Sequence, residues 1–252
     1  MIEPYDTLPG VRRSDLWEIR KTPLHFYRRS ERVSTPALRF GIAAHMALLE
    51  PFRYEDTYKV EPVVDRRTKE GRRIYDEFLN SLAPGGKEVI GWQDHDTIAD
   101  MVRAVREHPT AQEFLTGFYP EQVYQWHDHE TGELCKMKAD IVTTYHGKPY
   151  IVDYKTTNSC ADGDFEHSAR RYGYHVQAAM YSEGYFANTY QDPGFAFIAQ
   201  EKTAPYAVRV YFCDPYFVQQ GKEEYHRLMQ IYHHCKERNQ WPGYPDAELL
   251  GE

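Results

Sequence analysis

The chain of 252 residues is long enough to bury a full hydrophobic core, as one large domain or two small ones. Hydrophobic residues make up 41% and charged residues 27%, as in ordinary globular proteins, and no apolar run reaches the ~18 residues that a membrane helix requires. The net charge of −8 does not exclude a nucleic-acid partner, because binding depends on where the charges lie rather than on their sum.

The cysteines indicate a reducing environment. Cys135, Cys160, Cys213 and Cys235 are widely spaced and form no CxxC pair, which argues against a structural zinc or iron–sulfur site. We therefore expect reduced thiols. The N-terminus lacks the basic and then apolar pattern of a secretory signal, so we expect the protein in the cytoplasm and with no membrane partner.

Apolar residues in the first half of the chain recur at helical spacing. Ser14 is the expected N-cap of the first helix. Residues 54–64 remain ambiguous. The predicted helices cover a segment that starts at Ser14 and is interrupted near Pro23, a segment after Pro36 that contains His45, and residues 73–82 and 94–115.

From Glu121 the apolar period changes to two, which indicates strands. Helices followed by a strand cluster, and then by further helices and strands, predict one α/β domain over residues 1–252 with a mixed central sheet flanked by helices. The predicted elements are strands over 122–126, 134–144 and 150–154, a helix over 174–187, strands over 194–200 and 206–213, a closing helix over 215–239 and an acidic tail with proline and glycine from about residue 241.

The strongest chemical signal comes from Asp140, Asp153 and Lys155. Asp153 and Lys155 are two residues apart on an extended segment, so both side chains point to one face of the sheet. Two carboxylates on adjacent strands are enough to hold Mg²⁺, which prefers oxygen ligands and keeps several waters. Asp153 lies in an apolar stretch where an unpaired charge is costly. A metal site of a nuclease and a plain Asp153–Lys155 ion pair both satisfy this pattern.

Three weaker features accompany this pair of strands. Small residues around Gly41 would let the helix pack close to a sheet and direct His45 at a metal. Gln177 and Tyr181 are four residues apart and share a helix face, as packing residues often do. Glu121, at the start of the preceding strand, is either solvated or a ligand of a second metal.

Basic residues gather in two segments, which either form solvated helix faces or contact phosphates. Residues 11–39 contain eight basic and three acidic residues, a net charge of +5. The basic residues of the two segments are Arg12, Arg13, Arg20, Lys21, Arg28, Arg29, Arg32 and Arg39, and then Arg66, Arg67, Lys69, Arg72 and Arg73.

In combination, these residues resemble the PD-(D/E)XK nuclease superfamily, in the branch with the RecB-type nuclease domain. The match is closer to RecE-like exonucleases, which are exodeoxyribonuclease VIII and its phage relatives. The resemblance runs from about Ser14 to the closing helix, nearly the whole chain. The segments that carry it are residues 38–51, 67–69, 131–140, 152–157 and 174–181.

The resemblance implies a role for each candidate residue. His45, Asp140, Asp153 and the carbonyl of Tyr154 would bind the catalytic Mg²⁺, for which Mn²⁺ is expected to substitute. Lys155 would orient or activate the attacking water. The remaining candidates have assisting roles: Glu121 would help to bind a second cation, and Gln177 with Tyr181 would hold the active site and the DNA backbone.

The resemblance also implies a Mg²⁺-dependent exonuclease that acts 5′ to 3′ on the ends of double-stranded DNA and leaves 3′ single strands for recombination. It implies a ring-shaped homo-oligomer, with a tetramer favoured, and a single-strand annealing protein of the RecT type as partner. The expected location is the cytoplasm of a bacterial or phage-infected cell. Alternative functions are a single-strand nuclease or endonuclease of the same fold, a catalytically silent DNA-binding module, and a metal-binding structural domain.

Some positions depart from the family pattern. Ala139 replaces the proline of the superfamily name, and Asp153 replaces the glutamate option. Thr22 stands where members with an iron–sulfur cluster carry a cysteine before the proline, so that subgroup is disfavoured. Zinc is also disfavoured, because the histidine pairs His127/His129 and His233/His234 lack two further ligands at suitable spacing in the sequence.

Overall fold

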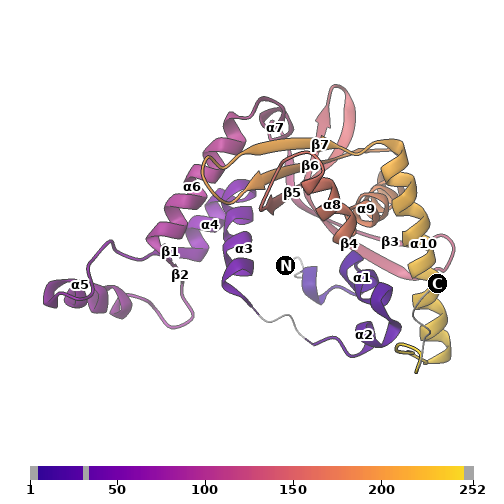
Figure 1. Cartoon of the computed structure of the whole chain (residues 1–252), viewed down its shortest axis with the longest axis horizontal. Helices are drawn as coiled ribbons and strands as arrows, with labels where there is room; N and C mark the ends of the chain where they lie inside the picture. The colour runs from indigo at the N-terminus through magenta and orange to yellow at the C-terminus, as the bar shows by residue number, and fades with distance from the viewer. Residues whose placement is uncertain (1–4, 31–33, 247–252) are drawn as a thin grey trace.

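The computed structural model describes residues 5–30 and 34–246. Its main sheet has five strands in the order β3-β4-β5-β6-β7, and a separate two-stranded sheet joins β1 and β2 (Figure 1). The strands are β1 (Tyr58–Val60), β2 (Glu88–Ile90), β3 (Tyr119–His127), β4 (Leu134–Tyr145), β5 (Lys148–Thr157), β6 (Gly194–Glu201) and β7 (Val208–Phe212).

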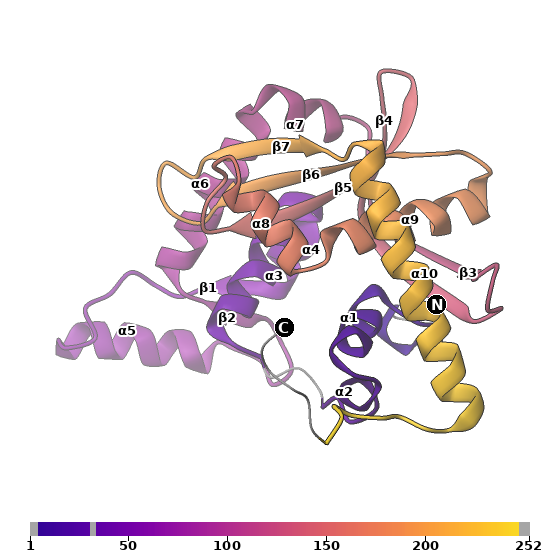
Figure 2. The ribbon, with the colours of Figure 1, turned by 45° about the vertical axis from the view of Figure 1, so that its right-hand side comes forward.

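Helices cover both faces of the main sheet (Figures 1 and 2). They are α1 (Arg13–Lys21), α2 (Pro23–Tyr27), α3 (Pro36–Leu49), α4 (Pro51–Thr57), α5 (Lys69–Asn80), α6 (Trp92–Glu107), α7 (Pro109–Phe114), α8 (Asp164–Arg171), α9 (Tyr174–Thr189) and α10 (Pro215–Arg238). Among the described helices, none is both long and apolar enough to cross a membrane.

The sheet is mixed. Strands β5 and β6 are parallel, whereas the β3–β4, β4–β5 and β6–β7 pairs are antiparallel. A parallel pair needs a long crossover connection, and α8 and α9 form that connection here. The prediction of an α/β fold with a mixed central sheet flanked by helices is therefore confirmed.

Each face of the sheet contributes to its own hydrophobic cluster. Strand residues Met137, Ile151 and Phe197 pack with α1, α9 and α10 on one face. Ile141 and Val152 pack with α3, α6 and α7 on the other face. Strand side chains alternate between the faces, so a strand covered on both sides is apolar at nearly every position. A polar residue in the middle of such a strand then needs a partner.

Some helix boundaries differ from the predictions. Ser14 is not the N-cap of α1, because the helix begins at Arg13 and the carboxylate of Asp15 accepts a hydrogen bond from the backbone N–H of Arg12. The helix predicted over 94–115 is divided into α6 and α7 at Pro109, which has no N–H to donate to a continuous helix. The sequence reading also missed the short α8 and the β1–β2 pair.

Helix α5 extends away from the rest of the chain in both views (Figures 1 and 2). Only Gly71 of this helix is buried. The predicted acidic tail, by contrast, begins with packed residues: Trp241 stacks on Tyr27, and the backbone N–H of Leu24 donates to the carbonyl of Pro242. Residues 247–252 of that tail lie outside the described residues.

Close packing of α9 against α10 depends on Gly221. A Cβ at this position would collide with the backbone carbonyl of His175. Because backbone cannot move aside cheaply, we expect Gly221→Ala to lower the free energy of unfolding by about 1–3 kcal/mol, the usual cost of overpacking. Urea denaturation would measure the loss. Gly41→Ala is the matched control, since a helical glycine replaced by alanine without contacts gains about 0.5–1 kcal/mol; equal stability of both variants would contradict the packing argument.

Candidate active site

The structure brings together side chains from five elements. His45 comes from α3, Glu121 from β3, Asp140 from β4, Asp153 with Lys155 from β5, and Gln177 from α9. These residues are separated along the chain but form two neighbouring sets of contacts. One set joins Glu121, His45 and Asp140, and the other joins Gln177, Asp153 and Lys155. The charges of the two sets influence each other.

His45 connects two carboxylates. Its Nε2 atom lies 2.7 Å from Oδ2 of Asp140, and its Nδ1 atom lies 3.4 Å from Oε1 of Glu121. The other oxygen of Glu121 pairs with the ammonium of Lys138. The ligand atoms of His45, Glu121 and Asp140 all lie within 4.8 Å of one another, so the three side chains could bind one metal ion.

Asp153 is the most deeply buried residue of the cluster, with 2% of its surface exposed. Its Oδ1 atom accepts a hydrogen bond from the amide of Gln177, and its Oδ2 atom pairs with the ammonium of Lys155. The Lys155 ammonium also lies 5.0 Å from the centre of the Tyr174 ring, a cation–π contact. Lys155 is therefore held from two sides, by a carboxylate and by an aromatic face.

The backbone is irregular where Glu121 and Asp140 face each other. Residues two apart on a regular strand share a face, yet Ala139 packs in the cluster beside α9 and Ile141 packs in the cluster on the opposite face. Glu121 has a φ of 54°, a left-handed conformation that is uncommon outside glycine and costs about 1–3 kcal/mol. Such strain often accompanies functional sites.

A side chain also replaces part of the sheet ladder at this point. The β4–β5 pairing ends at Ile141 and Val152, and the backbone N–H of Tyr154 donates to Oδ2 of Asp140 at 3.0 Å. The carboxylate of Asp140 is thus fixed by both Tyr154 and His45. The role of the Tyr154 carbonyl as a metal ligand stays a prediction. The ring of Tyr154 packs in the hydrophobic cluster on the face of the sheet that α3, α6 and α7 cover.

The two aspartates differ in their electrostatic environment. Burial raises the pKa of Asp153, and the negative charge of Asp140 raises it further. Burial would also raise the pKa of Asp140, but the positive charges of His45 and Lys155 outweigh it and lower that pKa. Burial lowers the pKa of His45, whereas Asp140 and Glu121 raise it to about 9. The cluster therefore favours bound positive charge next to Asp140.

These residues fit a divalent cation. Asp153 Oδ2 is buried and makes no hydrogen bond within the described part of the chain, although Lys155 lies close to it. Two buried carboxylates repel each other unless a cation compensates them. Carboxylate oxygens are the ligands that Mg²⁺ prefers. A neutral imidazole can also bind a metal, so a cation and a proton would compete for His45.

Tyr181 lies one turn after Gln177 on α9. Its ring packs edge-on against Phe195 at 6.4 Å between ring centres. Burial raises the pKa of its hydroxyl well above the usual value, and the negative charges of Asp153 and Asp140 add to the increase. Tyr181 therefore lies within electrostatic reach of the carboxylates, and its contact with DNA stays a prediction.

The small residues around Gly41 take part in the packing of α3, but Gly41 itself does not. Among the described residues, a Cβ built on Gly41 would meet no heavy atom within 4 Å. The close approach of α3 is made instead by Ala43 and Ala44, which are buried. These two residues lie next to His45 in the sequence and hold its helix against the core.

Two contributors to the site were missed in the sequence. Lys138 pairs with Glu121, and the ring of Tyr174 supports Lys155. The position of Lys138, two residues before Asp140 on the same strand, was an available signal for it. No sequence signal linked Tyr174 to Lys155, because they lie on different elements and meet only after folding.

Some residues of the predicted basic segments are paired with acidic residues within the chain. Ion pairs join Arg12 and Arg29 to Asp15, and Arg73 to Glu70 and Glu77. Arg32 lies outside the described residues. Among the described residues, the basic side chains of these segments that have no acidic partner include Arg28, Arg39, Lys69 and Arg72.

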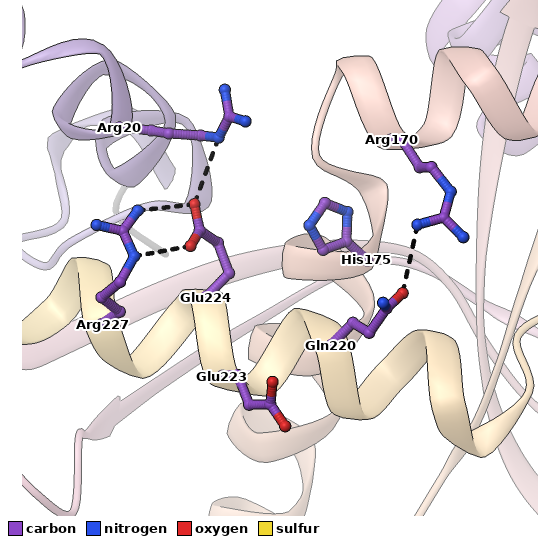
Figure 3. Close-up of a pocket in the computed structure, with 7 residues that line it drawn as sticks. All are labelled: Arg20, Arg170, His175, Gln220, Glu223, Glu224 and Arg227. Atoms are coloured by element: carbon purple, nitrogen blue, oxygen red, sulfur yellow. Dashed lines mark hydrogen bonds and ion pairs between the residues drawn. The ribbon is translucent and has the colours of Figure 1, made fainter. Parts of the chain in front are cut away.

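A cavity of about 470 Å³ lies between α1, α8, α9 and α10 (Figure 3). Glu224 pairs with both Arg20 and Arg227, and Arg170 points to Gln220. The cavity shares no lining residue with the carboxylate cluster. Its lining residues are Arg20, Arg170, His175, Gln220, Glu223, Glu224 and Arg227. Among the described residues, Arg170 and Glu223 form hydrogen bonds with glutamines but no ion pair.

Comparisons with known proteins agree with this fold. A family model described as "PDDEXK-like domain of unknown function (DUF3799)" matches residues 17–249. A crystal structure from Eubacterium rectale, named "Putative exonuclease", covers 98% of this chain and 97% of its own, with a TM-score of 0.61 and 14% identity. A second solved structure, SSO0001, covers 76% of this chain and 86% of its own at 15% identity, with a TM-score of only 0.30. No curated protein matches the sequence. The predicted PD-(D/E)XK core is thus confirmed at the level of the fold.

The high pKa of His45 depends on Asp140. In the metal-free protein, we expect Asp140→Asn to lower this pKa from about 9 toward the ordinary histidine value, about 6.5. The reason is that the substitution removes the strongest favourable charge while burial still disfavours the imidazolium. An NMR titration of the His45 ring would measure the change. Asp192→Asn, at an exposed position, is the control, and an unchanged His45 pKa in Asp140→Asn would refute the assigned cause.

Proposed function

The chain belongs to the family of PDDEXK-like domains of unknown function (DUF3799), and from this premise we propose that it is a magnesium-dependent nuclease that degrades double-stranded DNA from its ends. One observation carries the proposal: Asp140, paired with His45, lies close enough to Asp153 and Lys155 for their charges to interact, and Gln177 holds Asp153. This combination suits phosphodiester hydrolysis, in which negative charge builds up next to an anion.

The chemistry divides between the cation and the side chains. A divalent cation held by Asp140 and Asp153 would neutralise charge on the scissile phosphate and lower the pKa of a bound water. The ammonium of Lys155 lies beside the carboxylate of Asp153. Its positive charge would stabilise the attacking oxygen. Gln177 holds the carboxylate of Asp153 in a fixed orientation, so the metal ligand is preorganised before substrate binds.

His45 and Glu121 would complete the site. His45 faces Asp140 through Nε2, so the same nitrogen can bind the cation once it loses its proton. Glu121 lies on the far side of the imidazole and pairs with Lys138. We propose that Glu121 assists a second cation, and that Mn²⁺ can replace Mg²⁺ because it accepts the same oxygen and nitrogen ligands.

The finer proposals rest on the resemblance to RecE-like exonucleases over residues 38–51 and 152–157. They are 5′ to 3′ polarity, 3′ single strands as product, a ring-shaped homo-oligomer with a tetramer favoured, and an annealing protein of the RecT type as partner. Lys69 and Arg72 lie on α5, the helix that projects from the rest of the chain, and are suitable for contact with phosphates. Sedimentation of the chain as a monomer at all concentrations would count against the ring.

A single-strand nuclease or endonuclease of the same fold is the second candidate, because the carboxylates and Lys155 would perform the same hydrolysis on either substrate. A catalytically silent DNA-binding module is less consistent with the site. Such a module has no need of the candidate catalytic pair Asp153 and Lys155, and both residues are present. A metal-binding structural domain would release no nucleotides.

The two catalytic candidates on β5 can be tested with a matched control. We expect Lys155→Ala and Asp153→Ala each to slow nucleotide release from linear duplex DNA by about a hundredfold or more, because each removes charge at the reacting phosphate. Lys148→Ala removes an exposed lysine from the same strand and should retain full activity. Circular dichroism would verify that each variant is folded. Full activity in a folded Lys155→Ala or Asp153→Ala variant would refute the assignment.

The choice among nucleases can be made with duplexes labelled at either the 5′ or the 3′ end. With Mg²⁺, we expect immediate release of the 5′ label, late release of the 3′ label, and no cleavage of closed circular DNA. Omission of the metal should stop both reactions. Either of two other outcomes would support the second candidate. Cleavage of closed circles would indicate an endonuclease, and activity restricted to single strands would indicate a single-strand nuclease.

A further inference from the structure

A second group of metal-ligating side chains lies apart from the carboxylate cluster. His129 is on the turn between β3 and β4, Glu183 is on α9, and His226 is on α10. One potential ligand atom from each residue lies within 4.8 Å of the other two. The three residues come from distant parts of the chain, so their spacing in the sequence gave no sign of a common site.

The distances match those between ligands of one small cation. His226 Nε2 lies 3.1 Å from one oxygen of Glu183, and His129 Nδ1 lies 3.5 Å from the other. Ligands bound to zinc at about 2.0–2.1 Å in a tetrahedron are themselves about 3.3–3.4 Å apart. The two imidazoles and the carboxylate could therefore close on an ion with small movements of the side chains.

The outer contacts of His226 are those of a metal-bound histidine. Its second ring nitrogen, Nδ1, lies 2.9 Å from Oε1 of Glu130. Glu130 in turn accepts a hydrogen bond from the amide of Gln230. A histidine that binds a metal usually donates its other N–H to a carboxylate, which fixes the tautomer and orients the ring. Glu130 thus leaves Nε2 free to face Glu183.

One oxygen of the group lacks a hydrogen bond. Glu183 Oε1 is buried and has no hydrogen-bond partner in the described part of the chain, although His129 lies within ion-pair distance. A buried acceptor without a partner is costly. A cation between Glu183 and the two imidazoles would satisfy this oxygen, whereas the ion pairs alone do not.

The turn that carries His129 is held by hydrogen bonds. The buried carboxylate of Asp128 accepts hydrogen bonds from the backbone N–H and the hydroxyl of Thr131 and from the hydroxyl of Tyr225 on α10. The turn is therefore anchored to α10 one residue before His129 and one residue before His226. This anchoring keeps the two imidazoles close, with their ring centres 5.1 Å apart.

We propose that His129, Glu183 and His226 form a binding site for a first-row transition-metal dication, with Zn²⁺ as the best match, and that Glu130 orients His226 within it. Two nitrogen ligands and one carboxylate favour zinc over magnesium, which prefers oxygen and octahedral geometry. A water would take the fourth position. His129 is 62% exposed, so an ion can enter from solvent.

The bound ion would join the β3–β4 turn, α9 and α10. Helix α9 also carries Gln177, which positions Asp153, so the ion would stabilise the helix on which the first site depends. Zinc binding by this group is independent of the nuclease activity, because the two sites share no residue.

The test is equilibrium dialysis of the tag-free full chain against Zn²⁺ in excess Mg²⁺, with the metal content measured by mass spectrometry. We compare the natural chain with His129→Asn and Glu183→Gln. His129 is exposed on a turn, so its loss should leave the fold intact. His234→Asn is the control, because it removes an exposed histidine from α10 outside the group. Any zinc bound near Asp140 is common to all four proteins and cancels in the comparison.

We expect the natural chain and His234→Asn to bind one Zn²⁺ that His129→Asn and Glu183→Gln bind about tenfold more weakly or not at all. Co²⁺ in place of Zn²⁺ should give the visible absorption of a tetrahedral site in the first two proteins only. Zinc should also raise the melting temperature of the natural chain more than that of His129→Asn. Equal zinc binding by all four proteins would overturn the proposal, and so would absence of binding.

Discussion

Compensation of buried negative charge is the constraint on which the candidate active site depends. Asp153 is buried and Asp140 is largely buried between a sheet and the helices that cover it, where isolated carboxylates are strongly disfavoured. His45 and Lys155 supply positive charge, and Gln177 supplies a hydrogen bond. Removal of one such partner leaves a charge uncompensated, so each of these residues affects the stability of the site.

The sheet is adapted to these carboxylates. Two regular strands would continue their alternation through Asp140, but the apolar residues on either side of it pack on opposite faces of the sheet. Glu121 takes a left-handed conformation at the same level, and the carboxylate of Asp140 accepts the N–H of Tyr154 in place of a carbonyl. Regular strand pairing is lost near Glu121 and Asp140. In return, one imidazole on α3 can reach carboxylates from both β3 and β4.

Helix α9 connects the two sites that we describe. Near its start, the ring of Tyr174 supports Lys155, and Gln177 holds Asp153. Near its end, Glu183 faces two histidines from the β3–β4 turn and from α10. The helix packs closely on α10 because Gly221 lacks a side chain. Its position is thus determined by contacts at several points, which suits a helix that holds candidate catalytic groups in a fixed orientation.

Sequence reasoning was sufficient where the signal is local. The period of two from Glu121 predicted β3, β4 and β5, and the two-residue spacing of Asp153 and Lys155 predicted their common face, because strand geometry alone determines both. The family resemblance assembled the remaining candidates of the first site, whose catalytic roles stay predictions. Only the tertiary structure placed Lys138 and Tyr174 beside them, revealed the irregular strand at Asp140, and grouped His129 with Glu183 and His226. These contacts join residues far apart in the chain, so their distances depend on how helices pack on the sheet, which no local pattern encodes.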